Sequence, residues 1–227
     1  MQKRLRTTLL AAAALAAGVV SAEAQQVGRP YAGVNLGAHH ESADRVTGTT
    51  PAIGLTAGIR LTPGVGVEID VTRPGAELTR KYTGTSVSFA LRGASREEIE
   101  RLAVVTRFTD ARRILSTVSA GIAYYVPSSG RWSPRLFLGV TNHRARERTE
   151  RIHLSIPDGI DPERVRRALP DQAPFIRNLG ALTMGGSIGF AATRRLSISP
   201  DLRYDYGSIG DEINNVLGTS VRVLWSF

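Results

Sequence analysis

The sequence contains no cysteine, so a disulfide framework and an anchor attached through an acylated cysteine are both excluded. Long apolar runs are also absent, and the longest extends only from Leu9 to Val20. Because a membrane-spanning helix needs roughly 20 apolar residues, a helical membrane protein is excluded as well. The purely apolar Phe and the large Trp are few, with six and two residues, which leaves little material for a well-filled soluble core.

The amino-terminal segment is typical of a secretory signal. Three basic residues precede the apolar run, and Ala22 and Ala24 fit the small positions of an A-x-A cleavage site. The run is too short for the alternative, a membrane anchor. We therefore expect residues 1–24 to be a cleaved signal peptide. Residues 25–28 would then be a short periplasmic segment, and 29–227 the mature domain.

The chain is basic, with a formal net charge of +9. The segment 1–24 contributes three basic residues and one acidic residue, so the mature chain would carry +7. An exported protein seldom meets nucleic acid, and we expect anionic lipid or lipopolysaccharide phosphates as the counter-charge. About 200 residues correspond to one domain. Two classes remain, a soluble periplasmic β-protein and a transmembrane barrel.

Apolar and polar residues alternate along the mature chain in segments of about eight to ten residues, which predicts strands. The clearest pair, Ile53–Leu61 and Val65–Val71, is separated only by Thr62, Pro63 and Gly64, which predicts a tight hairpin. The eight predicted strands are 29–40, 53–61, 65–71, 114–126, 135–143, 182–192, 196–206 and 216–227.

The predicted connections alternate in length. Three are short turns, and the other four are long, over 40–49, 73–113, 144–178 and 207–214. Short turns at one end and long loops at the other are typical of outer-membrane barrels, whose turns face the periplasm. The predicted fold class is all-β, an eight-stranded antiparallel up-and-down transmembrane β-barrel, and the alternative is a soluble sandwich.

The less apolar face of these strands carries four basic and four acidic residues. In a soluble protein they would be solvated surface charges. An eight-stranded barrel has an interior just wide enough for side chains to fill, where a lone charge is costly. The balance therefore predicts an ion network in the lumen, made of Arg60, Glu68, Asp70, Arg135, Asp201, Arg203, Asp205 and Arg222.

The last strand places four apolar residues on one face, Val221, Val223, Trp225 and Phe227. This ending resembles the C-terminal signature of bacterial outer-membrane proteins, and the segment 31–37 resembles the first strand of the small OmpA- and OmpX-like barrel family. The resemblance implies an outer-membrane location, insertion by the barrel-assembly machinery through those four residues, and no single activity. We expect a monomer.

The two longest loops contain similar segments, Gly93–Leu102 and Gly159–Ala168, which align without gaps. Ser95 with Glu98 fits a capping box, and Asp161 fits a helix N-cap followed by proline. The pattern predicts a short helix in each loop, although chance similarity is the alternative. Guanidinium groups suit phosphate oxygens, so the loop arginines are candidate lipopolysaccharide contacts: Arg92, Arg96, Arg101, Arg164, Arg166 and Arg167.

Chemistry-bearing motifs are scarce. His39, His40 and His153 fall in or near predicted loops and would need close approach to act as a base or to hold a metal, but solvated loop histidines are commoner. The sequence contains no phosphate-cradling glycine motif. We expect no catalytic residue, metal or cofactor, and a non-enzymatic barrel serving envelope integrity or surface interaction. A small-solute pore and a lipid-A-modifying enzyme are the alternatives.

Overall fold

The computed structural model describes residues 27–43, 46–87, 103–128, 130–155, 163, 172–209 and 212–227. Nearly all of them lie in strands, whose side chains point alternately to the two faces of the sheet. The strands are β1 (Pro30–Ala43), β2 (Thr47–Arg60), β3 (Val65–Pro74), β4 (Leu78–Val87), β5 (Ala103–Tyr125), β6 (Trp132–Ser155), β7 (Gln172–Ala191), β8 (Leu196–Ile209) and β9 (Glu212–Ser226).

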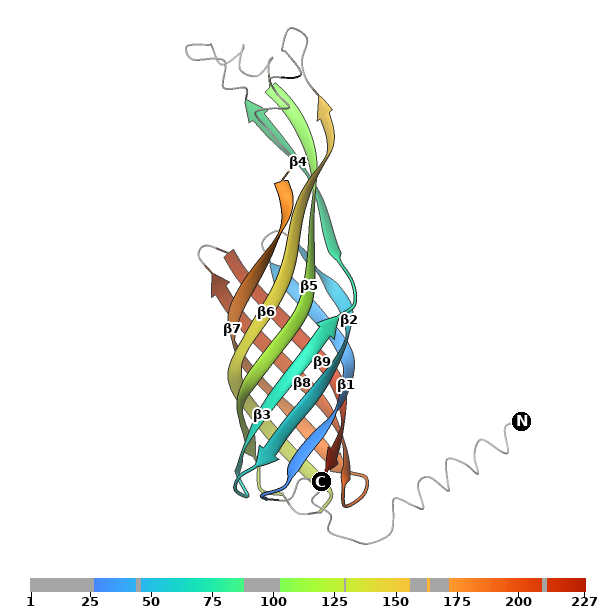
Figure 1. Ribbon diagram of the computed structural model, residues 1–227, viewed down its shortest axis with the longest axis vertical. Helices are drawn as coiled ribbons and strands as arrows, with labels where there is room; N and C mark the ends of the chain where they lie inside the picture. The colour runs from blue at the N-terminus through green and yellow to red at the C-terminus, as the bar shows by residue number, and fades with distance from the viewer. Residues whose placement is uncertain are drawn as a thin grey trace, which may run out of the picture.

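The strands close into one antiparallel barrel (Figure 1). Their order in the sheet is β3-β2-β1-β9-β8-β7-β6-β5-β4, and β3 also pairs with β5, which closes the sheet on itself. Only Gly75 to Glu77 separate β3 from β4, and both pair with β5, so the two segments form one barrel strand. The predicted eight-stranded antiparallel barrel is confirmed.

The closing strand of the barrel is β9. It pairs with β8 on one side and with β1 on the other, where Tyr31 lies opposite Ser226. The Phe227 N–H donates to the Pro30 carbonyl at 3.1 Å, which carries the pairing to the last residue. The wall of the barrel is thereby closed along the seam between the two ends of the chain.

The β2–β3 and β7–β8 turns lie at the end of the barrel opposite the loops, and both are stabilised by a threonine side chain. The Thr62 side-chain oxygen accepts hydrogen bonds from the N–H groups of Gly64 at 3.3 Å and Val65 at 3.0 Å. The Thr193 oxygen accepts from Arg195 at 3.2 Å and Leu196 at 3.0 Å. Each threonine side chain thus accepts from two backbone N–H groups of its own turn, which fixes both predicted hairpins.

At the loop end, the strands continue well past their predicted boundaries. Apolar alternation predicts loops over 73–113 and 144–178, yet β5 has 23 residues and β6 has 24. With β4 and β7 they form a sheet that rises above the barrel (Figure 1). The loop prediction is wrong because a strand outside the bilayer needs no apolar stripe, so the period-two signal disappears. The predicted loops over 40–49 and 207–214 are shortened in the same way.

Some predictions fall on residues that the structure does not describe. The signal segment 1–24 lies outside the described residues. So do the predicted helical segments Gly93–Leu102 and Gly159–Ala168, apart from Glu163. Within the described ranges, no helix has the length and apolar character needed to cross a membrane.

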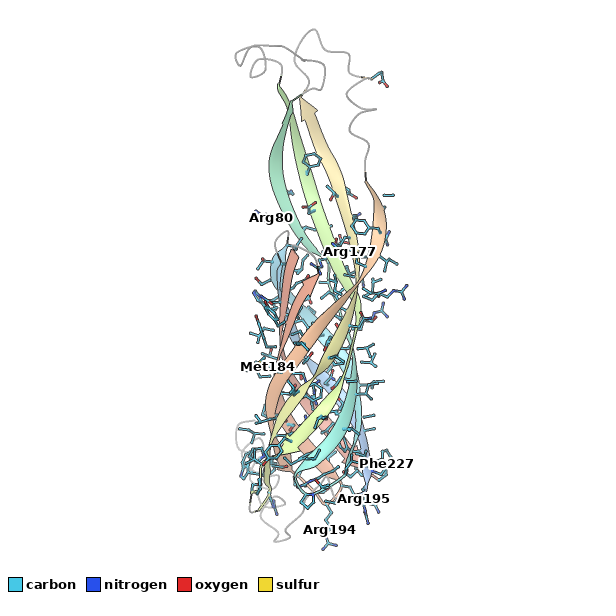
Figure 2. The ribbon with its side chains drawn as sticks, turned by 90° about the vertical axis from the view of Figure 1, so that its left-hand side faces the viewer. Arg80, Arg177, Met184, Arg194, Arg195 and Phe227 are labelled. Atoms are coloured by element: carbon cyan, nitrogen blue, oxygen red, sulfur yellow. The ribbon has the colours of Figure 1, made fainter. Side chains whose placement is uncertain are left out.

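Outward-facing side chains form an apolar belt around the barrel. Leu55, Leu138 and Leu182 are each at least 60% exposed, and Met184 lies about midway up the wall (Figure 2). Exposing this much apolar surface to water would be unfavourable, whereas lipid hydrocarbon covers it. The belt therefore accounts for the apolar stripe in the membrane-spanning strands and leaves the interior to the polar residues.

Candidate functional site: charged layers in the barrel interior

Strand alternation brings charged side chains from β3, β6, β8 and β9 together inside the barrel. Three carboxylates meet three guanidinium groups, so their formal charges cancel. All six side chains are at most 10% exposed. We call this group the central ion cluster, and it consists of Glu68, Asp70, Arg135, Asp201, Arg203 and Arg222.

Glu68 lies at the centre of the cluster and is completely buried. Its Oε1 accepts from Arg203 Nη2 at 2.5 Å and from Arg222 Nη1 at 2.7 Å. Its Oε2 accepts from Arg135 and from the Tyr31 hydroxyl, the latter at 2.9 Å. One carboxylate thus joins four side chains, and these contacts are what compensate for removing its charge from water.

The other two carboxylates complete the pairing of the arginines. Arg203 reaches Asp70 at 2.6 Å and Asp201 at 3.2 Å, while Arg222 reaches the same two residues at 3.1 and 3.3 Å. Arg135 lies 3.6 Å from Asp201. Each arginine therefore faces at least two carboxylates, which is the geometry that makes burial of several charges tolerable.

An aromatic ring fills the interior beside the cluster. The Arg203 guanidinium lies over the Phe137 ring, 3.9 Å from its centroid, a favourable cation–π arrangement. On the wall next to this ring are Gly121 and Gly139, which face each other across β5 and β6. A Cβ at Gly121 would come within 2.8 Å of Phe137 Cζ, so the glycines provide the space that the ring occupies.

The remaining two predicted lumen residues lie outside the central ion cluster. Arg60 lies at the turn end, where it donates to the Pro63 carbonyl and stacks on Tyr125 at 4.6 Å. Asp205 lies toward the loop end, 3.1 Å from Nε2 of the fully buried His143. The other ring nitrogen of His143 is 2.9 Å from the Thr117 hydroxyl.

A further charged layer lies above His143, and sequence reasoning missed it. Arg112 lies 2.8 Å from Glu41 and 3.5 Å from Glu147, and Arg177 lies 3.6 Å from Glu147. These residues fall in or beside segments predicted as loops. Extending the alternation of β1 and β6 would have placed Glu41 and Glu147 inside. The same extension along β5 would have placed Arg112 on the wrong face, because a register shift between Ile114 and Ser116 reverses the faces of that strand.

Little space remains between the layers. A cavity of about 40 Å³ lies between the central ion cluster and His143, lined by residues that include Asn35, Asp70 and Asp205. A buried water needs about 10–15 Å³ of such space, so the cavity has room for only a few waters. Ion pairs, rings and hydroxyl groups occupy the surrounding cross-section.

The other predicted site residues are placed as follows. Val221, Val223, Trp225 and Phe227 all face outward on the apolar belt at the closing strand. The six loop arginines proposed as lipopolysaccharide contacts lie outside the described residues. His40 bonds to the Thr49 hydroxyl at 2.9 Å. In the described part of the chain, no group of three or more His, Asp or Glu side chains is arranged to hold a metal.

A closed antiparallel barrel with an apolar outer belt and a charged, side-chain-filled interior defines a transmembrane β-barrel of the bacterial outer membrane. Residues 7–158 match the family described as the outer membrane protein beta-barrel domain, and the chain belongs to that family. No curated protein matches the chain. The predicted family resemblance and outer-membrane location are confirmed.

Solved structures show the same fold at low sequence identity. The outer membrane protein OprG from Pseudomonas aeruginosa is 10% identical, with a TM-score of 0.51, over 92% of this chain and 99% of that one. Neisserial surface protein A (NspA) is 14% identical, with a TM-score of 0.50, over 87% and 97% of the two chains. At this identity the likeness concerns the fold alone, and the short turns are assigned to the periplasmic side by the general layout of such barrels.

Proposed function

We propose that the protein is a non-enzymatic outer-membrane barrel with an occluded lumen, and that it acts at the cell surface through its loop-end sheet. In this proposal residues 1–24 direct export, cleavage follows Ala24, and the assembly machinery reads the outward face of β9. The lipid and lipopolysaccharide of the outer membrane are its partners, and the mature protein is a monomer.

The central ion cluster is the main evidence that the lumen is occluded. Its six charged side chains span the interior from β3 across to β6, β8 and β9, and Phe137 and Tyr31 pack beside them. An ion that crosses this layer would have to separate pairs that are buried and mutually bonded. This arrangement favours a structural or surface role over the alternative, a small-solute pore.

The outer surface just above the apolar belt supports a lipopolysaccharide partner. Arg144 and Arg146 point outward on β6, because they alternate with the buried His143, Ala145 and Glu147. Exposed basic residues on β3 and β4, which pair with the other side of β5, include Arg73 and Lys81. We call the outward-facing basic residues at this level the cationic collar: Arg73, Lys81, Arg144 and Arg146. Guanidinium groups at this height suit the phosphates of the outer leaflet.

The described residues give little support to the third alternative, an enzyme. Thr117, His143 and Asp205 lie in a row like a nucleophile, base and acid: His143 is hydrogen-bonded to Thr117, and its Nε2 lies 3.1 Å from Asp205. His143 has no exposed surface, so a substrate would have no access to this chain. Its arrangement fits a structural role within the interior layers.

Single-channel recording in planar bilayers tests the occluded lumen. We expect the purified protein to show no steady conductance, because the central ion cluster blocks the cross-section. The variant Phe137→Ala/Arg203→Ala, which removes the stacked pair, provides the matched comparison and is expected to conduct. A stable open conductance of the unmodified protein would overturn the proposal in favour of the pore.

The cationic collar is tested separately with lipopolysaccharide. We expect added lipopolysaccharide to raise the thermal unfolding temperature of the protein in detergent, and Arg144→Glu/Arg146→Glu to abolish this rise. Arg194→Glu/Arg195→Glu makes the same charge change at the foot of the barrel (Figure 2) and should leave the rise intact. An equal response of the two variants would remove lipopolysaccharide as a specific partner.

A further inference from the structure

The periplasmic end of the barrel encloses a second, larger cavity. Its volume is about 230 Å³, and it is lined by the turns after β2 and β5 and by the ends of β6, β7 and β8. We call it the periplasmic vestibule. Arg135, a member of the central ion cluster, is among its lining residues, so the vestibule reaches up to that cluster.

The vestibule exists because the β7–β8 hairpin has only small side chains at this level. The inward positions that line it are Ser187, Gly189, Ala191, Ser197 and Ser199. Farther from the turn, the inward positions of β8 are the large, charged residues Asp201 and Arg203. The small side chains of this one hairpin therefore account for the cavity.

The lining of the vestibule is cationic. It contains Arg60, Arg131 and Arg135, and among the described residues it contains no carboxylate. Glu68 and Asp201 balance Arg135 from the side of the central ion cluster. Arg60 and Arg131 add two more guanidinium groups to the wall that faces the vestibule.

Arg60 is held in place before any ligand arrives. Its side chain is 7% exposed, donates to the Pro63 carbonyl and lies over the Tyr125 ring at 4.6 Å. On the opposite wall, Arg135 Nε donates to the Ser187 hydroxyl at 3.1 Å. The Arg60 guanidinium and the Ser187 hydroxyl, each held by a neighbour, form a preorganised polar site, which lowers the entropy lost on binding.

We propose that the periplasmic vestibule binds a small anionic group, a carboxylate or phosphate carried on a hydroxyl-bearing molecule. Arginine forks match both anions, and the serine hydroxyls match the ligand's own polar groups. The volume lies below the roughly 300–1,000 Å³ of sites for drug-sized ligands, which limits the ligand to a small molecule or an end group. Because the lining side chains face the lumen, the group enters from the periplasm.

The test measures binding by the full-length mature protein in detergent or nanodiscs, with N-acetylmuramic acid as the carboxylate probe and glycerol 3-phosphate as the phosphate probe. We expect saturable binding of at least one probe. Arg60→Gln should weaken it about tenfold through loss of a charged hydrogen bond. Ser197→Val, which fills the hollow without changing its charge, should also weaken it. Arg194→Gln removes an arginine outside the lining and should leave binding unchanged.

Co-sedimentation with purified peptidoglycan distinguishes a wall-attached group from a free one. Retention that depends on Arg60 assigns the group to the wall, and binding of the free probe alone assigns it to a soluble molecule. Absence of saturable binding by both probes, or equal binding by Arg60→Gln and Arg194→Gln in folded protein, would overturn the proposal. Neither result would bear on the conductance or lipopolysaccharide experiments.

Discussion

At the scale of single residues, the interior depends most on Glu68. It bonds to three arginines and Tyr31, whereas Asp70 pairs with two of those arginines and Asp201 lies 3.2 to 3.6 Å from all three. Removing one carboxylate from a buried, balanced set leaves guanidinium groups with too little opposite charge. The cost of a substitution should therefore follow the number of partners lost.

We predict that Glu68→Gln lowers the free energy of unfolding by about 3 kcal/mol or more, the range for breaking a buried ion pair. Urea unfolding in lipid vesicles measures the change. Glu150→Gln is the matched control, since that carboxylate is 59% exposed and pairs with Arg148 at 2.7 Å. An exposed pair contributes less than about 1 kcal/mol. Similar effects of the two substitutions would contradict the importance of the central ion cluster.

The glycines beside Phe137 make a second residue-scale prediction. A Cβ at Gly121 would meet the backbone of Gly139 at 2.6 Å as well as the ring, so Gly121→Ala should destabilise the protein by about 1–3 kcal/mol through overpacking. Gly180→Ala introduces the same methyl group where no atom lies within 4 Å. Thermal unfolding of the two variants checks the difference, and equal melting temperatures would rule out a packing role for Gly121.

At the scale of elements, the sequence predicts strands well inside the bilayer and poorly outside it. Within the belt, lipid requires every second residue to be apolar, so the alternation is visible. Beyond the belt both faces of β6 carry charge, as in the run from Arg144 to Arg148, and the visible pattern ends. The buried layer of Glu41, Arg112 and Glu147 escaped prediction for this reason, and the bulge in β5 concealed Arg112 further.

The extension also leaves β4 different from its neighbours. Among the described strands, β4 forms its ladder with β5 alone, whereas the upper part of β5 pairs with both β4 and β6. About half of the backbone N–H groups of an edge strand lack a strand partner. We predict faster amide hydrogen exchange over 80–87 than over 103–112, measured by mass spectrometry. Equal protection of the two segments would show that another element covers the β4 edge.

At the scale of the whole molecule, the barrel depends on closure by β9. Its ladders with β1 and β8 join the two ends of the chain, and both would become open edges without it. We predict that deleting 221–227 abolishes the folded form. On a detergent gel, an unheated sample of the truncated protein should lack the heat-sensitive band, which is the folded barrel that shifts in mobility on boiling. Arg194→Gln/Arg195→Gln, at the same end, should retain that band. A heat-sensitive band in the truncated protein would show that closure is dispensable.

The length of β5 and β6 also determines how far the sheet extends beyond the membrane. At about 3.3 Å per residue, a strand of 23 residues measures roughly 76 Å along its path. Crossing the bilayer takes only about 9–11 residues. The dozen or so that are left over amount to roughly 40 Å of strand, measured along its path, beyond the lipid surface. Backbone hydrogen bonds to β4 and β6 hold this extension in place up to the described end of β5 at Ala103, well clear of the lipid.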